Sequence, residues 1–237
     1  MTIEALLLIP PILCDARVFE PQITAMSQDG TVQLAYTKEG ERIEEIASQI
    51  LDNAPQRFAL AGMGMGGTIA LEIFRRAPER VLRIALLATN VQSDSPDVAA
   101  MREPLIIAAR AGRLNDVVES ELMPAHLEPT AHRLAITHVL QNMAADFGMS
   151  AYVKQVRAMQ RRKDQQDILR KIKVPALVLC GENDVVNTLR RHEFVAQMIP
   201  YAKLEVISEA AHLPTLEQSA AVTQALRTWM TAPLLLR

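Results

Sequence analysis

The glycine-rich stretch AGMGMGG, residues 61–67, has a spacing that suits two different kinds of chemistry. Gly62, Gly64 and Gly67 form the pattern G-x-G-x-x-G, in which backbone near a helix N-terminus binds the pyrophosphate of a dinucleotide. Gly62 and Gly66 also frame the pattern G-x-S-x-G, in which a sharp turn between a strand and a helix presents a serine nucleophile. In this chain Gly64 stands where that serine would be.

The dinucleotide pattern lacks the residues that normally accompany it. It usually belongs to the first strand–helix unit, whereas the apolar run before it, residues 56–61, is the third candidate strand. An acidic residue about 20 positions further on should hold the ribose hydroxyls, but the next candidate strand leads into Asn90. We therefore favour the nucleophile-presenting turn, and we expect no cofactor.

The second pattern predicts two partners, first an acid and then a histidine, each in a turn after a later strand. The apolar run at 174–180 is followed by GEND, which supplies Asp184. The run at 203–207 is followed by SEAAHLP, which supplies His212. Both residues follow the carboxyl ends of strands, where open α/β sheets place their sites. We assign no role to the other histidines, which fall in or near helical patterns: His126, His132, His138 and His192.

Short apolar runs alternate with helical patterns along most of the chain. The candidate strands are residues 3–9, 31–36, 56–61, 82–88, 174–180 and 203–207. Apolar residues at helical spacing mark 42–53, the run after Gly67, 188–199 and 216–230. Several strands are continuously apolar, as strands covered on both faces are. We therefore predict an α/β fold, with a doubly wound, mostly parallel sheet of about six strands and helices on both faces.

Residues 91–171 interrupt this alternation, because we find no good strand among them. Helical patterns cover residues 96–112, 114–123, 130–147 and 150–162. We predict one core domain formed by residues 1–90 and 172–237, into which residues 91–171 are inserted as a helical cap of the same folding unit. The mixed charges RRKDQQD at 161–167 are predicted to be a solvent-exposed helix end.

Three stretches of the chain resemble the α/β-hydrolase fold family: LAGMGMGGTIALEIFRRAPERV, VPALVLCGENDVV and SEAAHLPTLEQ. The similarity is greatest to small capped esterases, lactonases and C–C hydrolases of that family, and it is weakest in the cap. It implies that His212 is a general base and that Asp184 orients it. It also implies an oxyanion hole made by the backbone N–H groups of Met65 and Ile12.

Two positions depart from the pattern of this family. Pro10 and Pro11 replace the usual His-Gly pair and lack N–H groups, but the donor is the following residue, so the hole can persist. Gly64 replaces the nucleophilic serine, which closes the acyl-enzyme route, and we expect a hydrolase that is inactive or strongly impaired. Glycine tolerates the strained turn, so this replacement fits an engineered knockout and a natural pseudoenzyme equally.

Three functions are compatible with these residues. The leading hypothesis is a serine-hydrolase scaffold for a small carboxylic ester, lactone or related carbonyl compound, with a small residual activity if His212 activates a water. One alternative is a binding protein or receptor whose apolar, Met-rich cap encloses a ligand. Another is a lyase or cofactor-free reaction in which His212 removes a substrate proton. Three methionines of the cap are expected mainly to pack against the core: Met143, Met149 and Met159.

The composition excludes several other classes. The chain has 237 residues, 49% of them hydrophobic, which suits one α/β domain with an insertion. A net charge of −2 and an aromatic content of 4% give no basis for binding nucleic acid or an anionic membrane. Cys14 and Cys180 are expected to be buried, reduced thiols, with no metal site. We expect a cytoplasmic protein, because the apolar N-terminal stretch lacks the positive flank of a signal peptide. Its expected partner is a small-molecule substrate or ligand.

Overall fold

The computed structural model describes residues 4–121 and 126–234, and its strands form one sheet in which neighbouring strands are parallel. The strands are β1 (Leu6–Ile9), β2 (Val32–Leu34), β3 (Phe58–Met63), β4 (Val81–Leu87), β5 (Ala176–Gly181) and β6 (Ala202–Ile207). Their order across the sheet is β2-β1-β3-β4-β5-β6. The predicted α/β fold is confirmed, although residue 3 of the first predicted strand lies outside the described residues.

Helices follow the strands, most of them where the apolar spacing predicts. The core helices are α1 (Glu20–Met26), α2 (Ile43–Asn53), α3 (Met65–Arg76), α9 (Leu189–Met198), α10 (Pro214–Glu217) and α11 (Ser219–Thr231), with a 3-10 helix, η1 (Ala16–Phe19), before α1. The sequence pattern does not indicate η1 or α1, because 4 and 7 residues are too few to display a helical period.

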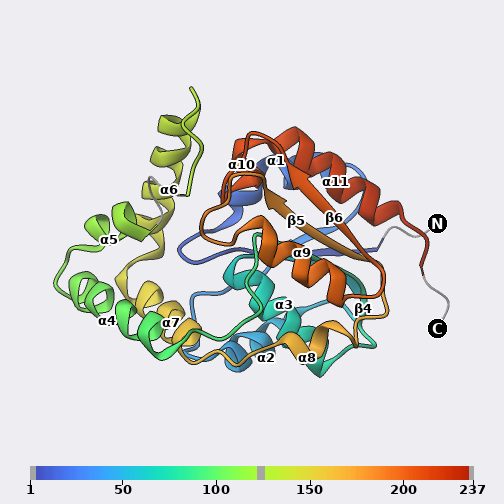
Figure 1. Ribbon diagram of the computed structural model, residues 1–237, viewed down its shortest axis with the longest axis horizontal. Helices are drawn as coiled ribbons and strands as arrows, with labels where there is room; N and C mark the ends of the chain where they lie inside the picture. The colour runs from blue at the N-terminus through green and yellow to red at the C-terminus, as the bar shows by residue number, and fades with distance from the viewer. Residues whose placement is uncertain (1–3, 122–125, 235–237) are drawn as a thin grey trace.

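Side chains of each strand alternate between two apolar cores, one on each face of the sheet. Leu7 and Ile9 of β1 pack in the core formed with α2 and α3. Leu6 and Leu8 of the same strand pack in the core formed with α1 and α11. Figure 1 shows α1 and α11 above the sheet and α2 and α3 below it, so helices cover both faces as expected.

Two helices, of 4 and 13 residues, replace the single helix predicted for residues 216–230. Gln218 separates α10 from α11, because its φ of −131° and ψ of 56° are not helical. The buried side-chain amide of Gln22 donates hydrogen bonds to the carbonyl oxygens of Thr215 (3.1 Å) and Ser219 (3.2 Å), on either side of the break. A tertiary hydrogen-bond pair therefore stabilises an interruption that the apolar spacing does not reveal.

The segment between β4 and β5 contains α4 (Pro96–Arg110), α5 (Leu114–Glu121), α6 (Arg133–Phe147), α7 (Met149–Gln160) and α8 (Gln166–Leu169). In Figure 1, α4 to α7 lie together at the end of the molecule opposite the labelled termini. They share an apolar cluster that also includes Leu13, from the loop after β1. Residues 122 and 123 of the second predicted cap helix lie outside the described residues. The domain boundaries at residues 90 and 172 stay a prediction.

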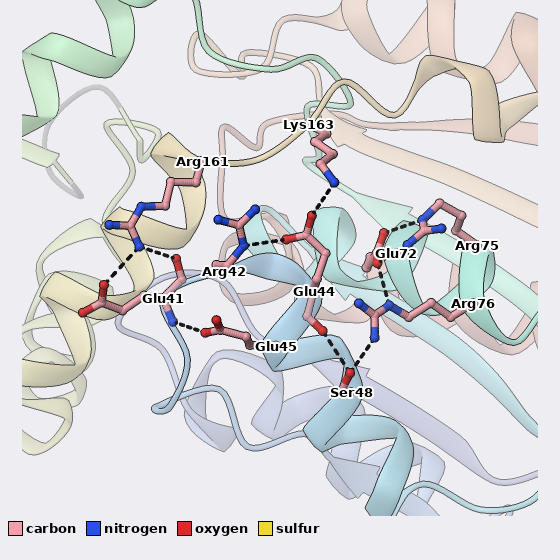
Figure 2. Close-up of polar contacts among 10 residues, drawn as sticks. All are labelled: Glu41, Arg42, Glu44, Glu45, Ser48, Glu72, Arg75, Arg76, Arg161 and Lys163. Carbon is pink, nitrogen blue, oxygen red and sulfur yellow. Dashed lines mark hydrogen bonds and ion pairs between the residues drawn. The ribbon is translucent and has the colours of Figure 1, made fainter.

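Charged side chains connect the end of α7 to the residues around the start of α2, as Figure 2 shows. Arg161 pairs with Glu41 and Lys163 pairs with Glu44, both at 3.1 Å. Both basic side chains are exposed, so each pair contributes about 0–1 kcal/mol. None of the described helices has the length and apolar character needed to span a membrane.

The run at 161–167 is not simply the solvent-exposed helix end that its charges suggest. Arg162 and Gln165 are buried, with exposures of 7% and 5%. The backbone N–H of Gln165 donates to the carbonyl oxygen of Val91, and its side-chain amide donates to that of Thr68. The chain turns inward after α7, and backbone carbonyls supply the acceptors that make this burial tolerable.

Candidate active site

The strand order creates a crevice beside the first and third strands. Because β1 lies between β2 and β3, the connections that leave β1 and β3 run in opposite directions across the sheet. A Cβ at Gly66 would lie 2.0 Å from the carbonyl oxygen of Ile9, so only glycine fits there. The helix α3 can therefore begin directly against the loop that follows β1.

Gly64 forms the turn between β3 and α3. Its φ of 55° and ψ of −118° would cost a residue with a side chain of order 1–3 kcal/mol. Its N–H donates to the carbonyl oxygen of Leu87 at 2.9 Å, which fixes the turn to β4. A Cβ at this position would also lie 3.2 Å from the Cβ of Pro11, closer than most such contacts. Position 64 thus has the strained backbone that the sequence pattern predicts.

Asp184 and His212 come together although 28 residues separate them. His212 Nδ1 lies 2.9 Å from Asp184 Oδ2, and the other carboxylate oxygen accepts the backbone N–H groups of Val186 and Asn187. Burial acts to raise the pKa of Asp184, but these hydrogen bonds outweigh it and hold the pKa below its ordinary value. An ionised carboxylate only accepts, so Nδ1 of His212 must carry a proton. In the neutral imidazole, Nε2 is then the nitrogen with a free lone pair.

Glu217 holds the backbone on both sides of His212. Its carboxylate accepts the N–H groups of Ala211 (3.0 Å), Leu213 (3.1 Å) and Glu128 (2.7 Å). Burial raises the pKa of Glu217, although the three backbone donors act in the opposite direction. This residue was not among the predicted site residues. A partial signal exists, because an acid one turn after Pro214 can reach back to N–H groups before the helix.

Two histidines without a predicted role lie near this pair. The ring of His126 meets that of His212 edge-on at 5.5 Å, and its carbonyl oxygen accepts the N–H of His212. His192 is fully buried, and its Nε2 accepts the N–H of Thr89 while Nδ1 faces the carbonyl oxygen of Thr188. Burial lowers the pKa of His192, which makes it a neutral packing residue.

The two N–H groups predicted to form an oxyanion hole have no hydrogen-bond acceptor in the described part of the chain. Met65 is the first residue of α3, where N–H groups have no partner within a helix. Ile12 belongs to the loop after β1, and both residues line one cavity. Their role as an oxyanion hole stays a prediction.

Gln155 of α7 fixes the loop that contains Ile12. Its Oε1 accepts the N–H of Leu13 at 2.9 Å, and its Nε2 donates to the carbonyl and hydroxyl oxygens of Thr37. Leu13 has a φ of 57°, an uncommon value that this contact stabilises. Gln155 is fully buried, yet a glutamine within a helical pattern gives no sign of such a role in the sequence.

A cavity of about 450 Å³ brings Ile12, Gly64, Met65 and His212 together, while Asp184 lies behind His212 with a side chain that is 0% exposed. Its lining differs from the apolar, Met-rich enclosure on which the binding-protein alternative is based, because it includes charged side chains: Asp94, Arg102, Arg162 and Arg191. No group of three or more His, Cys, Asp or Glu side chains in the described residues could hold a metal ion.

The methionines and cysteines mostly pack, as expected. Met143 and Met159 are buried in the cores, and Met159 also lines the cavity, whereas Met149 is 41% exposed. Cys14 and Cys180 are buried, as predicted, and neither forms a disulfide. Burial raises the pKa of both thiols, to about 12 for Cys180, so they are protonated at neutral pH.

This chain is similar to one protein family and to several known proteins. A family described as serine aminopeptidase, S33, matches residues 41–219. The biotin biosynthesis bifunctional protein BioHC of Teredinibacter turnerae is 24% identical over 187 residues, which span 73% of this chain and 33% of that protein. The pimeloyl-acyl-carrier-protein methyl ester esterase of Neisseria meningitidis serogroup A is 25% identical over 185 residues, which span 76% of this chain and 59% of that protein.

Comparison with solved structures shows the same fold. An esterase from Thermogutta terrifontis, solved with malate bound, has a TM-score of 0.88 and 24% identity, covering 97% of this chain and 90% of that one. The enol-lactonase of Burkholderia xenovorans has a TM-score of 0.87 and 22% identity, covering 98% and 93% of the two chains. These likenesses support the α/β-hydrolase fold.

Replacing Glu217 with alanine should destabilise the protein. The N–H groups of residues 128, 211 and 213 would lose their acceptor, and each unsatisfied buried group costs roughly 1–3 kcal/mol. We expect Glu217→Ala to lower the free energy of unfolding by about 2–4 kcal/mol in urea denaturation. The exposed Glu209, in the same loop, is the matched control; equal effects of Glu217→Ala and Glu209→Ala would contradict this role.

Asp184 should contribute to the pH dependence of stability. Because folding lowers its pKa, its contribution is present above its ordinary pKa of 3.8 and is lost as the pH falls through the lower value in the folded state. The free energy of unfolding of Asp184→Asn, measured in urea, should therefore fall less steeply below about pH 4 than that of the unaltered chain. Parallel losses would contradict this, and Asp52→Asn, at an exposed aspartate, is the control.

Proposed function

The chain belongs to the serine aminopeptidase S33 family of α/β-hydrolases, and on that premise we propose that its site is built to hydrolyse a small carboxylic ester, lactone or related carbonyl compound. The observation that carries this proposal is the hydrogen-bonded pair of Asp184 and His212 beside the strained turn at Gly64. The turn lacks its nucleophile, so the chain is a hydrolase scaffold that is inactive or strongly impaired.

The proposed roles follow from the protonation state of the pair. With Nδ1 donating to Asp184, Nε2 of His212 is the atom able to take a proton. In the complete mechanism a serine at position 64 would pass its proton to this nitrogen and attack the carbonyl carbon. The N–H groups of Met65 and Ile12 would then stabilise the negative charge on the carbonyl oxygen. Gly64 supplies no attacking oxygen, so no acyl-enzyme can form.

A slower route needs no side chain at position 64. A water beside Gly64 attacks the carbonyl carbon while His212 takes its proton, and the histidine then returns that proton to the departing alkoxide. In a serine protease, removal of a triad member leaves about 10³–10⁴-fold acceleration over water, and this route would be of that kind. The intact orientation of His212 by Asp184 supports it.

The volume of the cavity and the names of similar proteins both support this substrate class. A cavity of about 450 Å³ lies within the range for small molecules, roughly 300–1,000 Å³. The names of similar proteins include a methyl ester esterase and an enol-lactonase, both of which act on acyl–oxygen bonds. A small-molecule binding protein is the alternative, and the absence of an attacking atom at Gly64 favours it. Retention of a ligand without turnover would distinguish the two.

Restoring the nucleophile should restore activity. We expect Gly64→Ser to hydrolyse p-nitrophenyl acetate at least about a hundredfold faster than the unaltered chain, because a complete triad acts as a unit. Gly64→Ala is the matched control, since it adds the Cβ without the hydroxyl, and His212→Ala in the Gly64→Ser background should abolish the gain. A folded Gly64→Ser protein no faster than Gly64→Ala would refute the proposed function.

The same substitutions should reveal the strain in the turn. We expect Gly64→Ala and Gly64→Ser to lower the free energy of unfolding by about 1–3 kcal/mol. Gly112→Ala is a control for the backbone contribution, because Gly112 has a φ of 82° and no atom within 4 Å of an added Cβ.

Pro11→Gly separates the contact from the backbone strain. It removes the atom 3.2 Å from the added Cβ and should lower the cost of Gly64→Ala, but not that of Gly112→Ala, by about 0.5 kcal/mol or more in a double-mutant cycle. An unchanged cost would show that Pro11 does not crowd position 64.

A further inference from the structure

The cavity beside Gly64 contains an excess of positive charge. Arg102, Arg162 and Arg191 line it, and Asp94 is the one carboxylate among the described lining residues. Three guanidinium groups and one carboxylate leave two positive charges without a partner inside the lining. Nothing in hydrolysis at a neutral ester requires this excess, so it calls for a separate explanation.

Asp94 already serves two of the arginines. Its Oδ1 lies 2.7 Å from Arg162 Nη2, and its Oδ2 lies 2.9 Å from Arg102 Nε. The other nitrogens of Arg162 donate to the carbonyl oxygens of Gln92 and Met159, so each nitrogen of this buried guanidinium has an acceptor within the protein. Arg102 keeps both Nη nitrogens without an acceptor in the described residues.

Arg191 is the least compensated of the three. It is exposed, and its guanidinium has no hydrogen bond or ion pair with the described residues. It also lies in the first turn of α9, and that first turn contains no acidic residue. A cation near a helix N-terminus is unfavourable, because the helix dipole is positive there. The side chain is thus placed where an external anion would lower its electrostatic energy.

Arg162 is close enough to the other two guanidinium groups to be repelled by both. Burial lowers the pKa of Arg162, the carboxylate of Asp94 acts against this, and repulsion from Arg102 and Arg191 lowers the pKa further. A bound anion would relieve this repulsion. Guanidinium groups pair with carboxylates through two parallel hydrogen bonds, and the free Nη nitrogens of Arg102 and the whole guanidinium of Arg191 can both form them.

We propose that the ligand of this site carries a carboxylate in addition to its reactive carbonyl group, and that Arg191 and Arg102 bind that carboxylate. The inference rests on the proposed function, since it names the substrate class of the same cavity. Arg162 and Asp94 do not contact the ligand in this arrangement; they hold Arg102 in place. The half-ester of a short dicarboxylic acid is the simplest compound that combines both groups.

Binding can be tested on the unaltered chain, because it needs no turnover. Calorimetric titration with monomethyl glutarate and with dimethyl glutarate compares two ligands that differ in one charge. We expect the half-ester to bind at least about tenfold more tightly, as hydrogen bonds to charged groups imply. The preference should shrink as the salt concentration rises, because Arg191 is exposed.

Arg191→Gln should lower affinity for the half-ester about tenfold and leave affinity for the diester unchanged. Arg190→Gln is the matched control, since Arg190 is exposed in the same helical turn but is not among the described residues that line the cavity. Equal affinities for the two esters, absence of half-ester binding, or equal effects of the two substitutions would overturn the proposal.

The Gly64→Ser protein separates this proposal from the proposed function. If it turns over neither ester while the charge preference in binding persists, hydrolysis is refuted and the carboxylate site stands. If it hydrolyses both esters with equal kcat/KM, hydrolysis stands and the carboxylate site is refuted. Faster hydrolysis of the half-ester, reduced by Arg191→Gln and not by Arg190→Gln, supports both.

Discussion

The absence of a side chain at position 66 is the constraint on which the site depends. A Cβ there would lie 2.0 Å from the carbonyl oxygen of Ile9, so any larger residue would move the start of α3 away from the loop after β1. The N–H groups of Met65 and Ile12 would then separate. The connections that leave β1 and β3 run in opposite directions and so create the crevice. Gly66 allows the start of α3 to contact the loop after β1.

The sequence predicts the parts of the protein that depend on strand order. Asp184 and His212 could be located because parallel strands bring their carboxyl ends to one edge, and the structure places the two side chains 2.9 Å apart. The strained backbone of Gly64 could be predicted because a strand, a tight turn and a helix permit few conformations. These predictions need no knowledge of which side chains pack together.

Other parts of the site depend on tertiary partners that no local pattern records. Gln155 lies in a stretch predicted only to be helical, and Arg162 in a run predicted to be solvent-exposed, yet both are buried. Each is buried because distant groups satisfy it: the loop after β1 for Gln155, and Asp94 with two backbone carbonyls for Arg162. Arg162 is part of the charged lining of the cavity, whereas the sequence had offered an apolar, Met-rich enclosure as one alternative.

The contacts that organise the site are independent of the residue at position 64. Asp184 accepts hydrogen bonds from His212 and from two backbone N–H groups, and Glu217 holds the backbone around His212, without any contribution from a nucleophile. The site is therefore already ordered before a ligand arrives, which is the condition for electrostatic stabilisation of a reacting carbonyl. Replacing serine by glycine in such a site removes an interaction made in the chemical step and leaves those made in binding. The rate of the chemical step and the affinity for the ligand are therefore separable. A chain with this arrangement should lose far more of its rate than of its affinity.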